Sequence, residues 1–161
     1  MNRIGDNLIC TGANKEIIQS FTDKNVDFIL IGSLAVAWYC AERNADDMDL
    51  LVNCSKQNSE KVCAALQELN INGLELDSFT APGKIAPIKH YYYADILTQS
   101  RNGLTYEEVS NKTQKAKLFG ICVNLPDREC LIVLLQQAIK FQEGNVQKYE
   151  RDIELLRKHN V

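Results

Sequence analysis

Two aspartates and a Gly-Ser pair are the residues of this chain whose types and spacing could do chemistry. Gly32 and Ser33 directly follow the apolar run at 28–31, and Asp47 comes fifteen positions after Gly32. An apolar strand that runs into Gly-Ser and then a helix leaves backbone N–H groups where a phosphate can bind. Side chains alternate along a strand, so Asp47 and Asp49 are predicted to share a face. Two carboxylates held that close repel each other unless a cation lies between them, which indicates a Mg²⁺ site.

A phosphate-binding turn beside a Mg²⁺ site is typical of nucleotide-handling enzymes. The sequences Ile-Gly-Ser at 31–33 and Asp-Met-Asp-Leu at 47–50 resemble the signature of the nucleotidyltransferase superfamily, which has a DNA-polymerase-β-like core. The small-residue stretch at 34–41 and Arg43 are similar to its small bacterial members. These include minimal nucleotidyltransferases, relatives of abortive-infection toxins and antibiotic nucleotidyltransferases. The resemblance covers about residues 14–156.

The resemblance implies a two-metal site completed by a third carboxylate from a neighbouring strand. Asp95 is the candidate, because it is the lone acid in the apolar segment 91–97. Asp47, Asp49 and Asp95 are then predicted to be catalytic and to bind Mg²⁺ or Mn²⁺. The predicted nucleotide-binding residues are Gly32, Ser33 and Arg43.

Each assignment has a structural alternative. The Asp47–Asp49 pair could be the polar face of an edge strand, and Asp95 could pair with Lys89 or another cation, or face solvent. The Gly-Ser pair could be an ordinary strand-to-helix turn with a serine cap. Arg43 could form a structural salt bridge.

The activity implied by the resemblance is metal-dependent transfer of a nucleoside monophosphate from a nucleoside triphosphate to an acceptor hydroxyl. The acceptor would be an antibiotic, a tRNA or a protein. The chain departs from small bacterial members at Leu135, where a lysine is common, at Tyr149, where an aspartate is common, and at Ala45, where a threonine is common. The alternative is therefore a catalytically silent relative that serves as a nucleotide-binding or protein-interaction module.

Composition favours a single cytoplasmic domain spanning residues 1–161. Hydrophobic residues make up 45% and charged residues 24% of the chain, and no apolar run approaches the roughly 20 residues of a membrane span. A net charge of −3 argues against a general nucleic-acid coat protein. The N-terminus shows no signal-peptide pattern. Six cysteines, none spaced as CxxC, are predicted to be reduced packing residues.

The hydrophobic periodicity predicts an α/β fold, with a mixed sheet flanked by helices and a helical C-terminal portion. The core is expected at about 14–125 and the C-terminal helices at about 127–159. Ser33, Asn58 or Ser59, and Asp127 are the expected helix caps. Helices are predicted at 14–24, 33–42, 55–70, 127–141 and 146–158. Strands are predicted at 26–31, 47–52, 74–79, 85–90 and 91–97, with a hairpin formed by 115–118 and 121–123.

Overall fold

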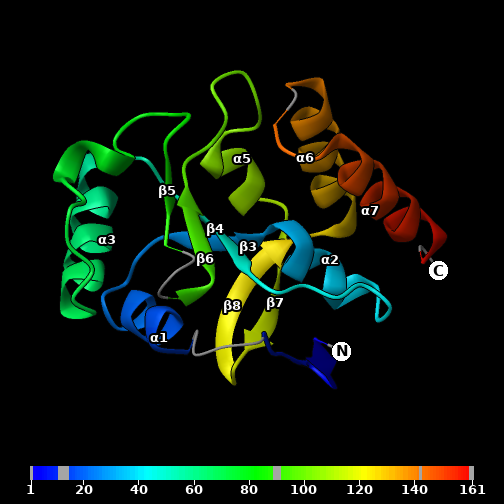
Figure 1. Ribbon diagram of the computed structural model, residues 1–161, viewed down its shortest axis with the longest axis horizontal. Coiled ribbons are helices and arrows are strands. Elements are labelled where there is room, and N and C mark those ends of the chain that lie inside the picture. Colours follow the sequence, from blue (N-terminus) through cyan, green and yellow to red (C-terminus); the bar gives the residue numbers. More distant parts are fainter. Residues whose placement is uncertain (1, 11–14, 89–91, 142, 160–161) are drawn as a thin grey trace.

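A mixed four-stranded sheet lies at the centre of the molecule, in a computed structural model that describes residues 2–10, 15–88, 92–141 and 143–159 (Figure 1). The strand order is β3-β4-β6-β5. β4 runs antiparallel to β3 and parallel to β6, and β5 is antiparallel to β6. The bounds are β3 (Phe28–Ile31), β4 (Met48–Val52), β5 (Ile85–Pro87) and β6 (Ala94–Leu97).

A second four-stranded sheet, in the order β1-β2-β7-β8, contacts the first through β8 and β3. Its long hairpin turns at Phe119 and Gly120, whose φ angles of 53° and 81° suit a two-residue turn that follows the twist of the strands. The two-residue strands β1 and β2 were not predicted. The bounds are β1 (Arg3–Ile4), β2 (Asn7–Leu8), β7 (Thr113–Leu118) and β8 (Ile121–Pro126).

Helices flank the sheets, as the sequence predicts. Figure 1 shows α1 and α3 at one end of the molecule and α6 and α7 at the other, with α2 following β3. Within the part of the chain that the structure describes, no helix is long and apolar enough to cross a membrane. The bounds are α1 (Lys15–Asp23), α2 (Gly32–Tyr39), α3 (Lys56–Glu68), the 3₁₀ helix η1 (Leu76–Phe79), α5 (Tyr106–Ser110), α6 (Arg128–Lys140) and α7 (Val146–Lys158).

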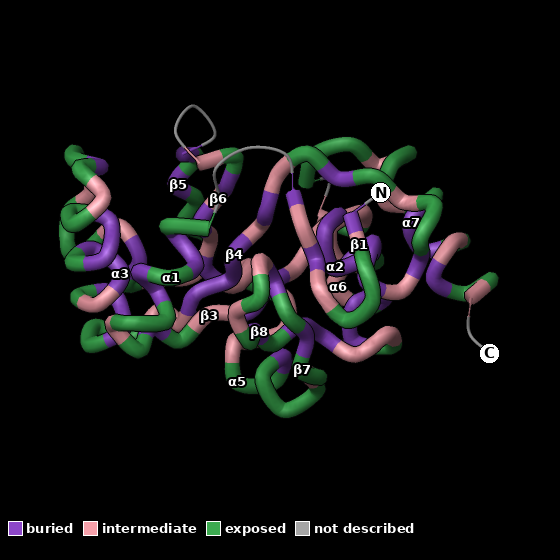
Figure 2. The backbone as a smooth tube through the Cα atoms, turned by 90° about the horizontal axis from the view of Figure 1, so that it is seen from below, coloured by how far each residue is buried: buried purple, intermediate pink, exposed green. Residues whose placement is uncertain are grey.

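The two faces of the central sheet bury different sets of residues, because side chains alternate along each strand. Leu30 and Leu50 belong to the main core, and Figure 2 shows the resulting buried segments along the strands. Ile29 and Leu51 belong to a smaller cluster with Val109 of α5 and Cys130 of α6. Since Asp49 is two residues from Leu51, its side chain lies on the face that α5 and α6 cover.

Three local predictions were wrong. The segment predicted as a strand at 74–79 contains η1, in which Glu75 and Ser78 form a reciprocal capping pair and Leu76 is exposed. Ser33 is not a helix cap: α2 already begins at Gly32, so Ser33 lies buried inside its first turn. The cap of α3 is Ser55, whose side chain accepts the backbone N–H of Asn58.

The other predicted elements are present, some with shorter or longer bounds. α7 has the predicted limits, and the Asp127 side chain caps α6 by accepting the N–H of Cys130 at 2.8 Å. β5 lies at a sheet edge and β6 in the interior, as predicted. α5 was not predicted. The predicted segments also included residues 14 and 89–91, which fall outside the described residues.

Candidate active site

Asp49 and Asp95 are direct neighbours on the central sheet. They are paired in the parallel register of β4 and β6, so their side chains lie on the same face. Both are partly buried. This arrangement contradicts the alternative that Asp49 belongs to the polar face of an edge strand, because β4 has a partner on each side.

Gly32 lies against the carboxylate of Asp49. Ile31, at the end of β3, pairs with Asp49, and the chain then enters α2 through Gly32 at a φ of +74°. A Cβ added at Gly32 would be 2.1 Å from Asp49 Oδ2. Only glycine therefore allows both the left-handed backbone and the close approach of the carboxylate. The Gly-Ser pair and the second aspartate of Asp-x-Asp thus form one structural unit.

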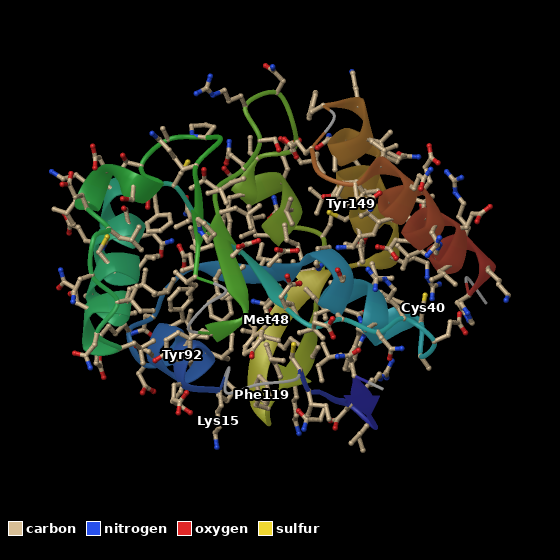
Figure 3. The ribbon with its side chains drawn as sticks, in the orientation of Figure 1. Lys15, Cys40, Met48, Tyr92, Phe119 and Tyr149 are labelled. Atoms are coloured by element: carbon tan, nitrogen blue, oxygen red, sulfur yellow. The ribbon has the colours of Figure 1, made fainter. Side chains whose placement is uncertain are left out.

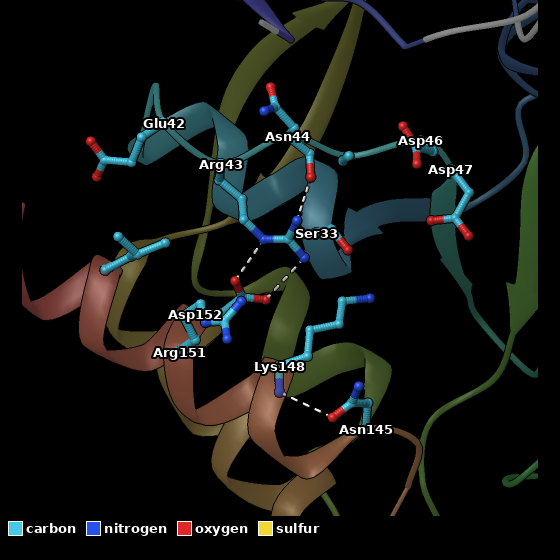
Figure 4. Close-up of a pocket in the computed structure, with 12 residues that line it drawn as sticks. Ser33, Glu42, Arg43, Asn44, Asp46, Asp47, Asn145, Lys148, Arg151 and Asp152 are labelled. Atoms are coloured by element: carbon cyan, nitrogen blue, oxygen red, sulfur yellow. Dashed lines mark hydrogen bonds and ion pairs between the residues drawn. The ribbon is translucent and has the colours of Figure 1, made fainter.

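Asp47 and Ser33 border a pocket of about 720 Å³ next to this unit (Figure 4). Asp47 lies immediately before β4, whose first residue, Met48, donates its N–H to the carbonyl of Tyr93 at 2.8 Å. The other walls of the pocket are the segment 42–46 and helix α7. The volume falls in the range of about 300–1,000 Å³ that is usual for small-molecule sites.

Arg43 forms a largely buried ion pair with Asp152 of α7, in which the Asp152 side chain is the more deeply buried. Its Nε is 2.7 Å from Asp152 Oδ1, and its Nη2 is 3.5 Å from Oδ2 (Figure 4). The two side chains are 18% and 2% exposed. The structure thus shows the structural salt bridge that the sequence left open for Arg43. Its predicted contact with a nucleotide stays a prediction.

Two further cations line the same pocket. Lys148 and Arg151 lie on α7 three positions apart. Both share a helix face with Asp152. In Figure 4 the Lys148 side chain extends from α7 toward the opening bordered by Ser33 and Asp47. Neither cation was among the nucleotide-binding residues predicted from the sequence. The spacing of charges in Lys-Tyr-Glu-Arg-Asp at 148–152 is the signal that could have indicated them.

The two late departures from the superfamily pattern have packing roles here. Leu135 is 5% exposed and belongs to the main core. Tyr149, labelled in Figure 3, packs against the same core, and its hydroxyl lies 2.6 Å from where a Cβ on Gly144 would be. Gly144 has a φ of +73° and precedes α7, so it leaves room for Tyr149 at this turn.

Metal binding by the three predicted aspartates stays a prediction. Among the residues that the structure describes, no three His, Cys, Asp or Glu side chains are grouped closely enough to hold a metal ion. The backbone nevertheless fits such a role: it pairs Asp49 with Asp95, places Asp47 two residues before Asp49, and keeps Gly32 free of a side chain.

The six cysteines are free thiols. Four of them, Cys10, Cys40, Cys63 and Cys130, are buried. Burial raises the pKa of the Cys130 thiol to about 11, with a further contribution from the nearby charge of Asp127. A thiol with a raised pKa is a poor nucleophile and a poor metal ligand. The four buried cysteines agree with the packing role predicted for all six, whereas Cys54 is only partly buried and Cys122 is exposed.

No family model and no curated protein matches the chain. Solved structures do. A crystal structure of ANT(2″)-Ia in complex with adenylyl-2″-tobramycin aligns with a TM-score of 0.56 and 14% identity, over 89% of this chain and 85% of that one. A nucleotidyltransferase-like antigenic protein from Paracoccidioides brasiliensis aligns with a TM-score of 0.53 and 14% identity, over 88% and 72%. The chain therefore has a nucleotidyltransferase-like fold, as its resemblance to that superfamily predicts.

Proposed function

We propose that the protein is a metal-dependent nucleotidyltransferase that moves a nucleoside monophosphate from a nucleoside triphosphate to a hydroxyl group. The observation that carries the proposal is the unit formed by Gly32, Asp49 and Asp95. A left-handed glycine at the start of α2 makes room for one carboxylate, and strand register sets a second carboxylate beside it. This unit lies in a fold that nucleotidyltransferases share.

In this reaction the acceptor oxygen forms a bond to the α-phosphorus, and the bond from the α-phosphorus to the bridging oxygen breaks, so that pyrophosphate leaves. Asp95 is proposed to take the proton of the acceptor hydroxyl. Asp47, Asp49 and Asp95 would hold Mg²⁺ or Mn²⁺, which would supply positive charge at the attacking and leaving oxygens. Ser33 and the N–H groups at the start of α2 would bind the terminal phosphates.

Lys148 and Arg151 support the same assignment of the pocket. A triphosphate carries several negative charges, and the pocket that Ser33 and Asp47 border has these two cations on its far wall. Arg43 contributes differently: its charge is paired with Asp152, so it shapes the pocket wall. Lys148 and Arg151 are therefore the cations assigned to the phosphates, beside Ser33 and the N–H groups of α2.

A small molecule is the acceptor class with the best support. One structural neighbour, ANT(2″)-Ia, is described in complex with adenylyl-2″-tobramycin, a nucleotide-modified antibiotic. No comparable observation supports a tRNA or a protein as the acceptor. The silent-module alternative is favoured by two departures from the superfamily pattern: Leu135, where a lysine is common, lies in the core, and Tyr149, where an aspartate is common, packs against it.

The decisive experiment is a transfer assay. Each α-labelled nucleoside triphosphate is incubated with the protein, Mg²⁺ or Mn²⁺, and a panel of hydroxyl-bearing antibiotics, tRNA and protein, and products are identified by mass. Asp49→Asn and Asp95→Asn should lower transfer by at least about 10²-fold. Asp77→Asn is the matched control, because it makes the same charge change on the exposed surface of η1.

A second readout separates a protein that binds a nucleotide without transferring it from one that does not bind a nucleotide. Mg²⁺ with the preferred triphosphate should raise the melting temperature of the wild type, and Asp49→Asn should remove that rise. Binding without transfer to any acceptor class would favour the silent module. If the protein neither binds nor transfers a nucleotide, the proposed function is wrong.

A further inference from the structure

The segment 40–47, which links α2 to β4, forms no helix or strand but is held by contacts on both sides. It carries Arg43, it forms one wall of the pocket, and it ends at Asp47. Its position therefore decides where Asp47 lies relative to Ser33. Two distant parts of the chain hold it: the N-terminal residues 2–10 on one side and helix α7 on the other.

Asn2 holds the segment through the backbone of Ala45. Its Oδ1 accepts the N–H of Ala45 at 2.8 Å, and its Nδ2 donates to the carbonyl of Ala45 at 2.8 Å. The same Nδ2 donates to the carbonyl of Ile9 at 3.0 Å. Asn2 is 6% exposed and Ala45 is 5% exposed. One buried amide side chain thus satisfies both backbone polar groups of the residue that lies two positions before Asp47.

Neighbouring residues of the N-terminal hairpin, which is formed by β1 and β2, strengthen this contact. The Arg3 guanidinium lies 3.9 Å from the centre of the Trp38 ring and donates to the Trp38 carbonyl, at the end of α2. Cys10 Sγ lies 3.8 Å from the carbonyl of Ala45. The hairpin is itself closed by the Ile9 N–H, which donates to the Asn2 carbonyl at 2.7 Å.

On the far side of the segment, the Arg43–Asp152 pair ties it to α7. Beyond Asp47, the Met48 N–H is held by the Tyr93 carbonyl. Asp46 and Asp47 therefore lie between two fixed points, Ala45 and Met48. If Asn2 is lost, Ala45 loses both hydrogen bonds to Asn2 and keeps the Cys10 Sγ contact, while Met48 stays held.

We propose that Asn2 is a positioning residue, which fixes the segment 40–47 so that Asp47 borders the pocket opposite Lys148. The consequence for catalysis rests on the proposed function, whereas the anchoring of the segment does not. No motif of the sequence indicates this role, because Asn2 and Ala45 are 43 positions apart.

Asn58 provides a matched control variant. It is 2% exposed, its Oδ1 accepts the N–H of Asp27 at 2.7 Å, and its Nδ2 donates to the carbonyls of Asp27 and Asn53. It therefore makes the same set of three backbone hydrogen bonds as Asn2. Its partners lie just before β3 and just after β4, at the end of this strand pair away from Ile31 and Asp49. Asn58→Ala should destabilise the fold without moving Asp47.

The experiment compares Asn2→Ala with Asn58→Ala by amide hydrogen exchange and by transfer kinetics. Asn2→Ala should speed exchange at the Ala45, Asp46 and Asp47 amides by about tenfold, and Asn58→Ala should do so at Asp27 instead. Asn2→Ala should also lower kcat/KM by about 10–100-fold through kcat, because a shift of about 1 Å in a catalytic group costs that much. Asn58→Ala should leave both kinetic constants within about twofold of the wild type.

Asn2→Gln covers the case in which Asn2→Ala does not fold. It keeps an uncharged amide with the same acceptor and donors but moves them by one methylene, so an intermediate loss is expected. Equal exchange at residues 45–47 in the two alanine variants, or equal kcat, would overturn the proposal. If the wild type transfers no nucleotide at all, the proposed function fails, and the exchange data alone then decide whether Asn2 holds the segment.

Discussion

Gly32→Ala is the substitution that tests the geometry of the site most directly. It adds one methyl group at a residue whose φ is +74°, and that methyl would lie 2.1 Å from Asp49 Oδ2. Ordinary contact begins near 3.4 Å, so the carboxylate has to move by more than about 1 Å. The substitution therefore strains the backbone and displaces the predicted metal ligand at the same time.

The cost of the backbone conformation and the cost of the close contact can be separated with a control variant. A left-handed φ costs an alanine about 1–2 kcal/mol. Forcing an added methyl into an occupied space costs about 1–3 kcal/mol more. Gly120→Ala is the control for the first effect, because Gly120 has a φ of +81° and nothing within 4 Å of its added Cβ. Gly32→Ala should thus be less stable than Gly120→Ala by about 1–3 kcal/mol.

Urea denaturation of both variants measures this difference, and a third comparison identifies its cause. In the background of Asp49→Ala, the nearest Asp49 atom to the added methyl is the Cβ at 3.1 Å, so Gly32→Ala should cost much less there. Gly32→Ala should also lower transfer about 10²-fold, while Gly120→Ala stays near wild type. Equal stability of Gly32→Ala and Gly120→Ala would refute the close approach of Gly32 and Asp49.

Other predictions concern the buried groups. Arg43→Met should reduce the free energy of unfolding by about 3–5 kcal/mol, because it leaves the buried Asp152 charge without its partner. Asp152→Ala should cost less, because Arg43 is partly exposed and keeps its bond to the Asn44 carbonyl. The double variant should cost clearly less than the sum of the two, and strict additivity in urea denaturation would contradict this. Burial raises the pKa of Cys130 from 9.0 to about 11, so the folded chain keeps a proton that the unfolded chain releases. Stability should therefore fall as pH rises from 9 toward 11, and less steeply in Cys130→Ala. In native protein at neutral pH, a thiol reagent should label exposed Cys122 rapidly and Cys130 only on unfolding, with all six thiols recovered after unfolding; loss of two to a bridge would contradict the reduced state.

The sequence was sufficient for elements whose signals are local. The limits of α7 and the Asp127 cap of α6 follow from helical spacing and from cap chemistry within a few residues. The same local reasoning failed at 74–79, where alternating apolar and polar residues predicted a strand. A strand also needs a partner strand, and this segment belongs to neither sheet; the local Glu75–Ser78 capping pair instead holds it as the 3₁₀ helix η1.

The candidate site divides in the same way. The types of residue at Gly32, Asp47 and Asp49 and their spacing could be recognised in the sequence, because the strand-to-helix turn and the following strand lie close together in the chain. The parallel register that pairs Asp49 with Asp95 is set by which strands become neighbours. Asp95 was predicted from its apolar surroundings, but only the sheet places it beside Asp49.

The partners of Asn2 and Arg43 were decided by the tertiary structure alone. Arg43 could be read as a nucleotide ligand or as half of a salt bridge, and the packing of α7 against the segment 40–47 brings Asp152 to it. No sequence pattern around Asn2 indicates its partner, which is set only when the N-terminal hairpin packs against Ala45. Local propensities act between residues a few positions apart, whereas buried polar groups take whichever partners the completed core leaves within hydrogen-bonding distance.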